Sequence, residues 1–231
     1  MAAVAARELR DGEVVFVGIG LPNLACNLAR RTHAPSLVLI YESGAVGAVP
    51  ARLPVSIGDP ALVTGSLMVC GMADVFQLFL QNGRIEVGFL GGAQVDRYAN
   101  INTTVIGSYE KPTVRLPGSG GAAEIAIHAQ RILVISKLSP RVFPGRVDFL
   151  TSPGDRVHRV ITDKAILEPE GSTRELLLAA LYPGVEAADV QAGIGWTLRC
   201  KPQVHRIDPP TRVELQLLRE VLDPQRHYLK G

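Results

Sequence analysis

The sequence lacks the features that mark several large classes of protein. Its three cysteines, Cys26, Cys70 and Cys200, are an odd number without a C-x-x-C pair, which argues against a zinc ribbon and against a secreted disulfide framework. The five histidines are dispersed, so no metal site is expected. The N-terminus shows no signal-peptide pattern and no apolar run is long enough to span a bilayer, so we expect a cytoplasmic protein that does not enter a membrane.

The sequence also lacks an excess of charge of either sign. The formal net charge is only +2, and no block of like charges appears along the chain. This balance gives no reason to expect nucleic acid as a partner. A hydrophobic content of 47% and a charged content of 20% are ordinary for a packed globular protein. The length of 231 residues suits one sizeable domain, which we expect to cover residues 1–231.

What is present is an alternation of short β-rich runs with helical patterns, typical of an α/β fold with an open, mainly parallel sheet and helices on both faces. In the first part of the chain the expected strands are 13–20, 36–42, 85–92 and 131–136, and the expected helices are 22–32, 73–81 and 118–130. Later, 147–150, 159–167 and 175–181 could be strands, and 186–195 and 211–222 have helical patterns.

Glycine-rich segments follow three of the apolar runs, at 18–22, 42–48 and 90–96. Ligands of open parallel sheets bind outside the carboxyl ends of the strands, where these glycines fall. Turn geometry alone could also require them, and 18–22 lacks the full dinucleotide-binding fingerprint, because Pro22-Asn23 replace its second half. A NAD site is therefore not favoured.

Glu42 is the most informative single residue, because it closes an apolar run and is followed at once by Ser43-Gly44. It is either a functional carboxylate at the mouth of the sheet or an ordinary exposed glutamate. Asp59 and Asp96 are in turn-like settings, where aspartate commonly accepts hydrogen bonds from nearby backbone N–H groups. Cys26 and Cys70 are expected to be small core residues.

A set of motifs in a fixed order carries a family resemblance. The runs IYESGAVGA, RLPVSIGDPALVTGS, GGAQVDRYANINTTVIG, VRLPGSGGAAEIA and VDFLTSPG, with GIGLP before them and Gly195-Trp196 after them, cover most of the chain. Together they resemble the B subunits of the glutaconate CoA-transferase type, in the class I CoA-transferase family. The sequence departs from the pattern at Ala99-Asn100, where relatives more often have Gly-Asn.

The resemblance implies which residues form the site. Glu42 would be the residue that becomes acylated, and backbone N–H groups of Gly91 and Gly92 would help to form an oxyanion hole. The loops expected to face the substrate or coenzyme A contain Gly18, Gly20, Ser43, Gly44, Gln94, Gly118, Gly120 and Gly121. The resemblance also implies a partner A subunit, in a heterodimer or an α₂β₂ or higher assembly.

Chemically, the implied reaction moves coenzyme A between an acyl-CoA and a carboxylic acid through a covalent glutamyl-CoA thioester, with ping-pong kinetics and no permanently bound cofactor. A thiol pKa of about 8.5 makes the thiolate a good leaving group, so no histidine acid is needed. The ionised nucleophile could not be fully buried without compensating donors. Two alternatives stay open: an acyl-CoA hydrolase or hydrolytic ring-opening enzyme on the same scaffold, and a non-catalytic binding or regulatory protein.

Overall fold

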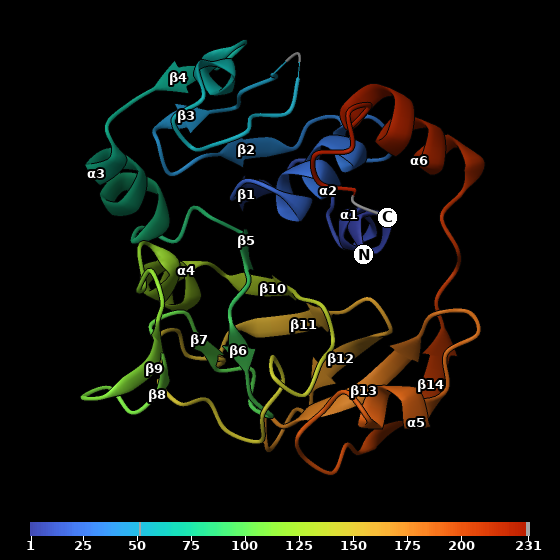
Figure 1. Ribbon diagram of the computed structural model, residues 1–231. Coiled ribbons are helices and arrows are strands. Elements are labelled where there is room, and N and C mark those ends of the chain that lie inside the picture. The colour runs from blue at the N-terminus through green and yellow to red at the C-terminus, as the bar shows by residue number, and fades with distance from the viewer. Residues whose placement is uncertain (51, 230–231) are drawn as a thin grey trace. The chain divides into compact units, whose positions relative to one another are not determined.

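The computed structural model describes residues 1–50 and 52–229, and the chain divides into two compact units (Figure 1). Unit 1 contains Met1–Phe89, His128–Gln130 and the chain from Pro210 onward. Unit 2 contains Leu90–Ile127 and Arg131–Pro209. The predicted strands mostly form, and the α/β class is confirmed.

In unit 1 the paired strands follow the order β5-β1-β2-β3-β4. Its strands are β1 (Val14–Phe16), β2 (Val38–Ile40), β3 (Ala45–Val46), β4 (Met68–Val69) and β5 (Val87–Leu90). β1 is parallel to both β5 and β2, whereas β3 and β4 are added in antiparallel pairing. The parallel centre therefore ends in a short antiparallel ribbon whose outer strand is β4.

The helices of unit 1 include those expected at 22–32, 73–81 and 211–222. They are α1 (Ala2–Arg7), α2 (Leu21–Arg30), η1 (Pro60–Val63), α3 (Met72–Asp74) continued by η2 (Val75–Leu80), and α6 (Arg212–Gln216) continued by η3 (Leu217–Leu222). α2 begins directly after Gly20 with a proline in its first turn, as predicted. No helix within the described ranges, 1–50 and 52–229, is long and apolar enough to cross a membrane.

An ion pair joins the helix α6 to the N-terminal helix α1. The Arg7 guanidinium donates to both carboxylate oxygens of Glu214, at 2.6 and 2.9 Å. Glu214 also accepts from the backbone N–H of Thr211, in a capping box at the start of α6. The bond from Arg7, followed by that from Thr211, lowers the pKa of Glu214 despite its partial burial. α6 is thereby held to the N-terminal helix of the same unit.

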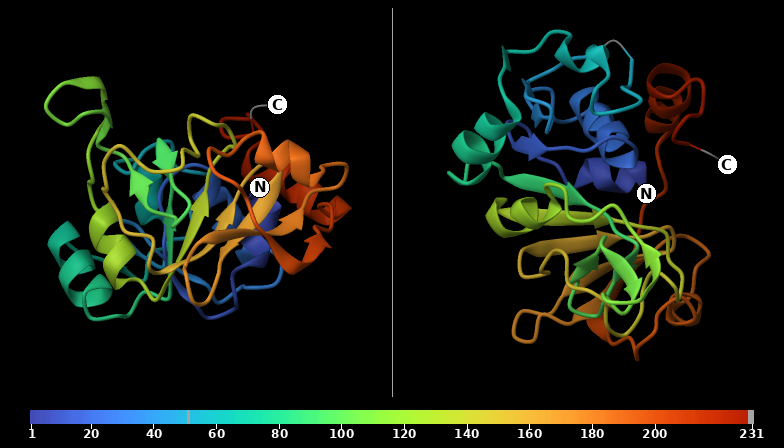
Figure 2. Two further views of the ribbon diagram at one scale, coloured as in Figure 1. Left: turned by 90° about the horizontal axis from the view of Figure 1, so that it is seen from below. Right: turned by 60° about the vertical axis from the view of Figure 1, so that its left-hand side comes forward.

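In unit 2 the main strands pair in the order β14-β13-β12-β11-β10. These strands are β10 (Arg131–Ile135), β11 (Val157–Ile161), β12 (Ala165–Pro169), β13 (Leu176–Leu181) and β14 (Cys200–Arg206). Two small ribbons and two helices complete the unit: β6 (Gln94–Val95) with β7 (Ile101–Asn102), β8 (Val105–Gly107) with β9 (Pro112–Arg115), α4 (Ala122–His128) and α5 (Ala187–Gln191). The β8–β9 hairpin extends away from the main strands of this unit (Figure 2).

Two expectations for this part of the chain were wrong, and the strand β14 was not expected. Residues 147–150 form a loop, in which the Asp148 side chain accepts hydrogen bonds from Gln94 of β6 and Gly107 of β8. The run 159–167 is not one strand but the hairpin of β11 and β12, which turns at Thr162–Lys164, where the Thr162 hydroxyl caps the turn. β14 was missed, since its residues are mainly exposed and it lacks an apolar run.

The Ala99 departure falls on an unusual backbone position. Ala99 is buried and has a φ of 61°, a left-handed conformation that favours glycine. The Asp96 carboxylate holds this turn by accepting from the backbone N–H groups of Tyr98 and Asn100, at 3.0 Å each. The turn-forming role predicted for Asp96 is confirmed.

Candidate active site

Glu42 lies in a tight turn that joins β2 to β3. The Gly44 N–H donates to the Tyr41 carbonyl at 2.9 Å, and the Tyr41 N–H donates to the Ala45 carbonyl at 3.0 Å. The Glu42 side chain is half-buried and Ser43 is exposed. Glu42 therefore lies in a short turn that hydrogen bonds hold in place, and it remains accessible to a ligand.

The residue before Glu42 anchors this turn to α2. Tyr41 is only 1% exposed, and its hydroxyl donates to Asn23 Oδ1 at 2.8 Å. Asn27 Nδ2 donates to the same oxygen at 2.8 Å. Burial, followed by the nearby Cys26 thiol, raises the pKa of Tyr41, so the hydroxyl stays protonated and keeps donating at neutral pH. The base of the Glu42 turn is thus fixed to a helix.

The other side of the turn is fixed by β4. The Cys70 N–H donates to the Gly44 carbonyl at 3.0 Å. Gly44 has a φ of 107°, and a Cβ atom added there would lie 1.9 Å from the Cys70 carbonyl oxygen. Only glycine fits this contact. Cys26 is buried as predicted, but Cys70, expected in the core, is only half-buried because it follows the edge strand.

The Gly18–Gly20 loop emerges at the same edge of this sheet. β1 and β2 are in parallel register with Phe16 opposite Ile40, and the Val17 N–H donates to the Ile40 carbonyl at 3.0 Å. The segments that follow β1 and β2 therefore leave the sheet side by side, as the sequence predicted. Gly18 is exposed, and a Cβ there would meet nothing within 4 Å. No packing contact explains glycine at this position, which leaves room for a ligand to approach the backbone.

Within unit 2 the structure brings two other predicted loops together. Gly91 is exposed and Gly92 half-buried, and a Cβ at Gly92 would lie 2.4 Å from Ile101 Cγ2. The hollow that follows these glycines holds about 250 Å³, and the residues that line it include Ala93, Thr103 and Gly118. The Gly118 N–H donates to the Thr103 carbonyl at 2.9 Å, while Gly120 is exposed and Gly121 half-buried.

The Gln94 side chain is hydrogen-bonded to other residues of unit 2. Its Nε2 donates to Asp148 Oδ2 at 3.0 Å, and its Oε1 accepts from Asn102 Nδ2 at 2.7 Å and from the Asp148 N–H at 2.9 Å. The residue is buried. Its side chain thus ties the β6–β7 ribbon to the 147–150 loop.

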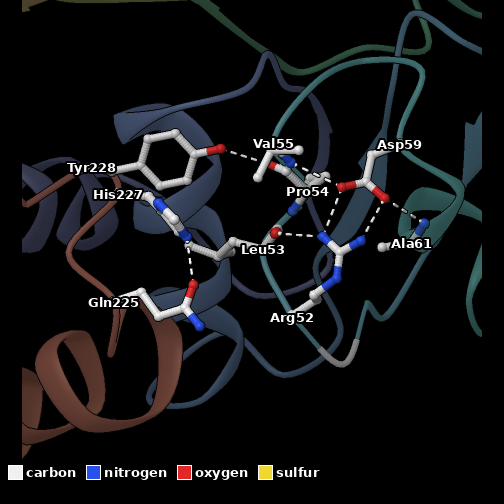
Figure 3. Close-up of polar contacts among 9 residues, drawn as sticks. All are labelled: Arg52, Leu53, Pro54, Val55, Asp59, Ala61, Gln225, His227 and Tyr228. Atoms are coloured by element: carbon white, nitrogen blue, oxygen red, sulfur yellow. Dashed lines mark hydrogen bonds and ion pairs between the residues drawn. The ribbon is translucent and has the colours of Figure 1, made fainter.

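The segment after the Glu42 hairpin is organised by one carboxylate. The Asp59 side chain accepts from both terminal nitrogens of Arg52, at 2.7 and 2.9 Å, and from the backbone N–H groups of Val55 and Ala61 (Figure 3). The Tyr228 hydroxyl donates to the Pro54 carbonyl of the same loop. The Arg52 bonds, followed by those of the backbone, hold the pKa of Asp59 well below its usual range. The predicted turn role of Asp59 is confirmed.

This network predicts a pH dependence. A carboxyl whose pKa is lowered by folding stabilises the fold above its unfolded-state pKa, about 3.9, and loses that contribution as the pH falls below it. We expect the difference in unfolding midpoint between wild type and Asp59→Asn to be constant above about pH 5 and to shrink below about pH 4. Urea unfolding followed by circular dichroism measures it, with Asp155→Asn as an exposed control. A difference that stayed constant down to about pH 2.5 would contradict this role.

Several supporting residues were not predicted. Asn23, Asn27 and Tyr41 form the buried anchor below Glu42, and their only sequence signal is a pair of asparagines four positions apart on a helix. Within the described part of the chain, no group of three or more His, Cys, Asp or Glu side chains is placed to hold a metal ion.

Comparison with known proteins gives consistent matches. The family model described as coenzyme A transferase matches residues 1–193. The chain is 49% identical to the B subunit of 3-oxoadipate CoA-transferase from Pseudomonas knackmussii, covering 95% of this chain and 90% of that protein. It is 32% identical to the B subunit of glutaconate CoA-transferase from Acidaminococcus fermentans, covering 99% and 93%. The crystal structure of the Acidaminococcus fermentans enzyme superposes with a TM-score of 0.93 at 30% identity, over 100% of this chain and 95% of that chain.

Proteins with other reactions share the fold at lower identity. The structure of the decarboxylase AibA/AibB superposes with a TM-score of 0.90 at 27% identity, covering 98% of this chain and 94% of that chain. The cholesterol ring-cleaving hydrolase IpdB subunit of Rhodococcus jostii is 28% identical, covering 89% of this chain and 83% of that protein. Fold alone therefore does not select the reaction.

Proposed function

The chain belongs to the coenzyme A transferase family, and we propose that it is the subunit carrying the nucleophile, Glu42, of a two-subunit enzyme. In this proposal the enzyme moves coenzyme A from an acyl-CoA to a carboxylic acid. The observation that carries it is the position of Glu42, half-buried in a turn that α2 anchors on one side and Cys70 on the other. Such support is what a nucleophile needs, because small misplacements are costly.

Four steps balance the reaction. The Glu42 carboxylate attacks the thioester carbonyl, the C–S bond breaks, and a mixed anhydride and CoA thiolate form. The thiolate attacks the glutamyl carbonyl and releases the first carboxylic acid as its carboxylate, leaving a glutamyl-CoA thioester. The incoming carboxylate attacks that thioester, whose C–S bond breaks, so that a new anhydride forms and the CoA thiolate is released again. The thiolate then attacks the acyl carbonyl of the anhydride, which gives the new acyl-CoA and frees the Glu42 carboxylate. No proton is gained or lost.

The developing oxyanion needs hydrogen-bond donors. We propose that the backbone N–H groups of Gly91 and Gly92 supply them, at about 3 kcal/mol for a well-placed donor. The exposure of Gly91 supports a role in contacting a ligand. The open space at Gly18 supports a similar close approach by the Gly18–Gly20 loop.

The similarity to the B subunit of a 3-oxoadipate CoA-transferase supports a more specific proposal for the acceptor acid. We propose that the acceptor is a 3-oxo dicarboxylic acid of the size of 3-oxoadipate. This goes further than the glutaconate label that the sequence motifs first suggested. An assay of the assembled enzyme with a panel of carboxylic acids tests it, and a preference for glutaconate over 3-oxoadipate would overturn it.

Chemical trapping tests the covalent step. Incubating the assembled enzyme with acyl-CoA and then borohydride should reduce the glutamyl thioester to an alcohol. The peptide containing Glu42 then loses one oxygen and gains two hydrogens, which mass spectrometry detects. The same treatment without acyl-CoA is the control. An unmodified Glu42 in an active enzyme would favour transfer of the acyl group to water, the reaction type of a hydrolase.

A further inference from the structure

Exposed apolar side chains are concentrated in one segment of unit 1. Of the sixteen large hydrophobic residues found exposed in the described chain, nine lie between residues 49 and 78. We use the name apolar patch for seven of them, which lie on the β3–β4 ribbon and on the loop that joins its strands: Val49, Val55, Ile57, Val63, Leu67, Met68 and Val69. Met72 and Leu78 follow on the next helix.

The segment carries almost no free charge. Between residues 49 and 78 the charged residues are Arg52, Asp59 and Asp74, and each has a partner inside the segment. Arg52 is paired with Asp59, and Asp74 accepts from the Gly71 N–H at 3.0 Å. Depletion of charge around exposed apolar groups marks the core of a protein interface rather than a solvated loop.

The patch has a defined shape before any partner binds. Leu67 packs over Gly47, where a Cβ would be 2.7 Å from its Cδ1, and Val49 Cβ lies 3.3 Å from the corresponding position of Gly65. Each of the two side chains is thus seated over a glycine of the facing segment, although Leu67 is 78% exposed. Asp59 holds the intervening loop with its four hydrogen bonds. A preorganised surface loses less conformational entropy on association.

A hollow of about 370 Å³ adjoins the patch at Val55. Apolar atoms of Leu53, Val55, Leu222 and Pro224 line it. Its polar groups are already used within the chain: Asp223 accepts from three backbone N–H groups, and His227 pairs with Gln225 (Figure 3). Such a hollow suits one apolar anchor side chain of a partner.

We propose that the apolar patch is the surface on which the companion subunit of this enzyme binds. The 49%-identical relative is called a B subunit, and the AibA/AibB structure is of a two-component protein, which favours a second, different subunit over another copy of this chain. The inference rests on the proposed function, which requires such a subunit. The patch also continues into the Glu42 turn, because Val69 pairs with Ala45 and Cys70 bonds to Gly44. A companion seated there covers the active site and holds its turn.

A matched pair of variants tests this surface. Val69 on β4 and Val213 on α6 are 61% and 60% exposed, so Val69→Glu and Val213→Glu add the same charge at equal exposure. We expect the companion subunit to bind Val69→Glu at least about 100-fold more weakly than wild type, because the new carboxylate is buried unpaired in the complex. Val213→Glu should bind as wild type does. Analytical ultracentrifugation of the full chain with the A subunit of the Pseudomonas knackmussii enzyme measures both.

Thiol labelling gives a second measurement that needs no variant. Cys70 is half-buried beside the patch, whereas Cys200 in unit 2 is exposed. We expect the companion subunit to slow maleimide labelling of Cys70 in the wild-type chain at least tenfold relative to its rate in the free chain, with Cys200 as the internal reference. Unchanged labelling of Cys70 in the complex, or assembly of Val69→Glu with wild-type affinity, would overturn the proposed interface. So would self-association of the chain through this face. Failure of the trapping at Glu42 in an assembled complex would instead overturn the proposed function and leave the interface standing.

Discussion

We expect Glu42→Gln to lower kcat for CoA exchange by at least about 1,000-fold while the two subunits still assemble. Glutamine keeps the length and shape of the side chain, but its amide cannot form the anhydride. The half-buried side chain makes no hydrogen bond or ion pair within residues 1–50 and 52–229, so the change should leave the unfolding midpoint nearly unaltered. Initial rates of exchange between an acyl-CoA and a carboxylate measure the effect.

A control at the other end of the same strands separates chemistry from structure. The Glu86 carboxylate accepts from the Val14 N–H at 2.6 Å, at the start of β1, whereas Glu42 lies beyond the end of β2. Glu86→Gln changes the same functional group away from the proposed site and should retain exchange. Glu42→Asp should be intermediate, because it keeps the carboxylate but withdraws it by one methylene group, and about 1 Å of misplacement can cost 100-fold. Retained exchange in assembled Glu42→Gln would remove this residue from the mechanism.

The half of the site that the sequence could predict depends on local signals. The apolar runs before Gly18 and Glu42 are strands, and Pro22 starts a helix, because period and turn chemistry are encoded within a few residues. Parallel pairing then brings the two strand ends to one edge. Asp59 and Asp96 accept hydrogen bonds from backbone groups up to four residues away, so their turns were also predictable.

The rest depends on contacts between distant residues. Cys70 contacts Gly44, which is 26 positions away, and no sequence pattern near either residue predicts the antiparallel ribbon that joins them. The 147–150 loop has strand-like composition, yet Asp148 bonds to Gln94, 54 positions away. An exposed β14 gives no apolar signal at all. Contacts between distant residues determine the local structure in these cases, so the sequence pattern alone could not predict it.

Gly44→Ala is expected to be the most damaging single-methyl change near Glu42. The new Cβ would overlap the Cys70 carbonyl oxygen, and alanine would also have to adopt a φ of 107°. Moving a backbone carbonyl means displacing β4, so we expect a loss of about 3 kcal/mol or more in the free energy of unfolding. Because the displaced turn carries Glu42, the rate of exchange should fall as well, by about 100-fold.

Gly20→Ala is the matched control for the stability measurement. Gly20 has nearly the same φ, 104°, but a Cβ there would meet nothing within 4 Å. It should therefore lose only the backbone strain, about 1–2 kcal/mol, and the remaining difference from Gly44→Ala measures the contact with Cys70. Urea unfolding of both variants and wild type gives the two losses. Equal losses would show that Cys70 can move aside freely, and the turn that holds Glu42 would then not be fixed by β4.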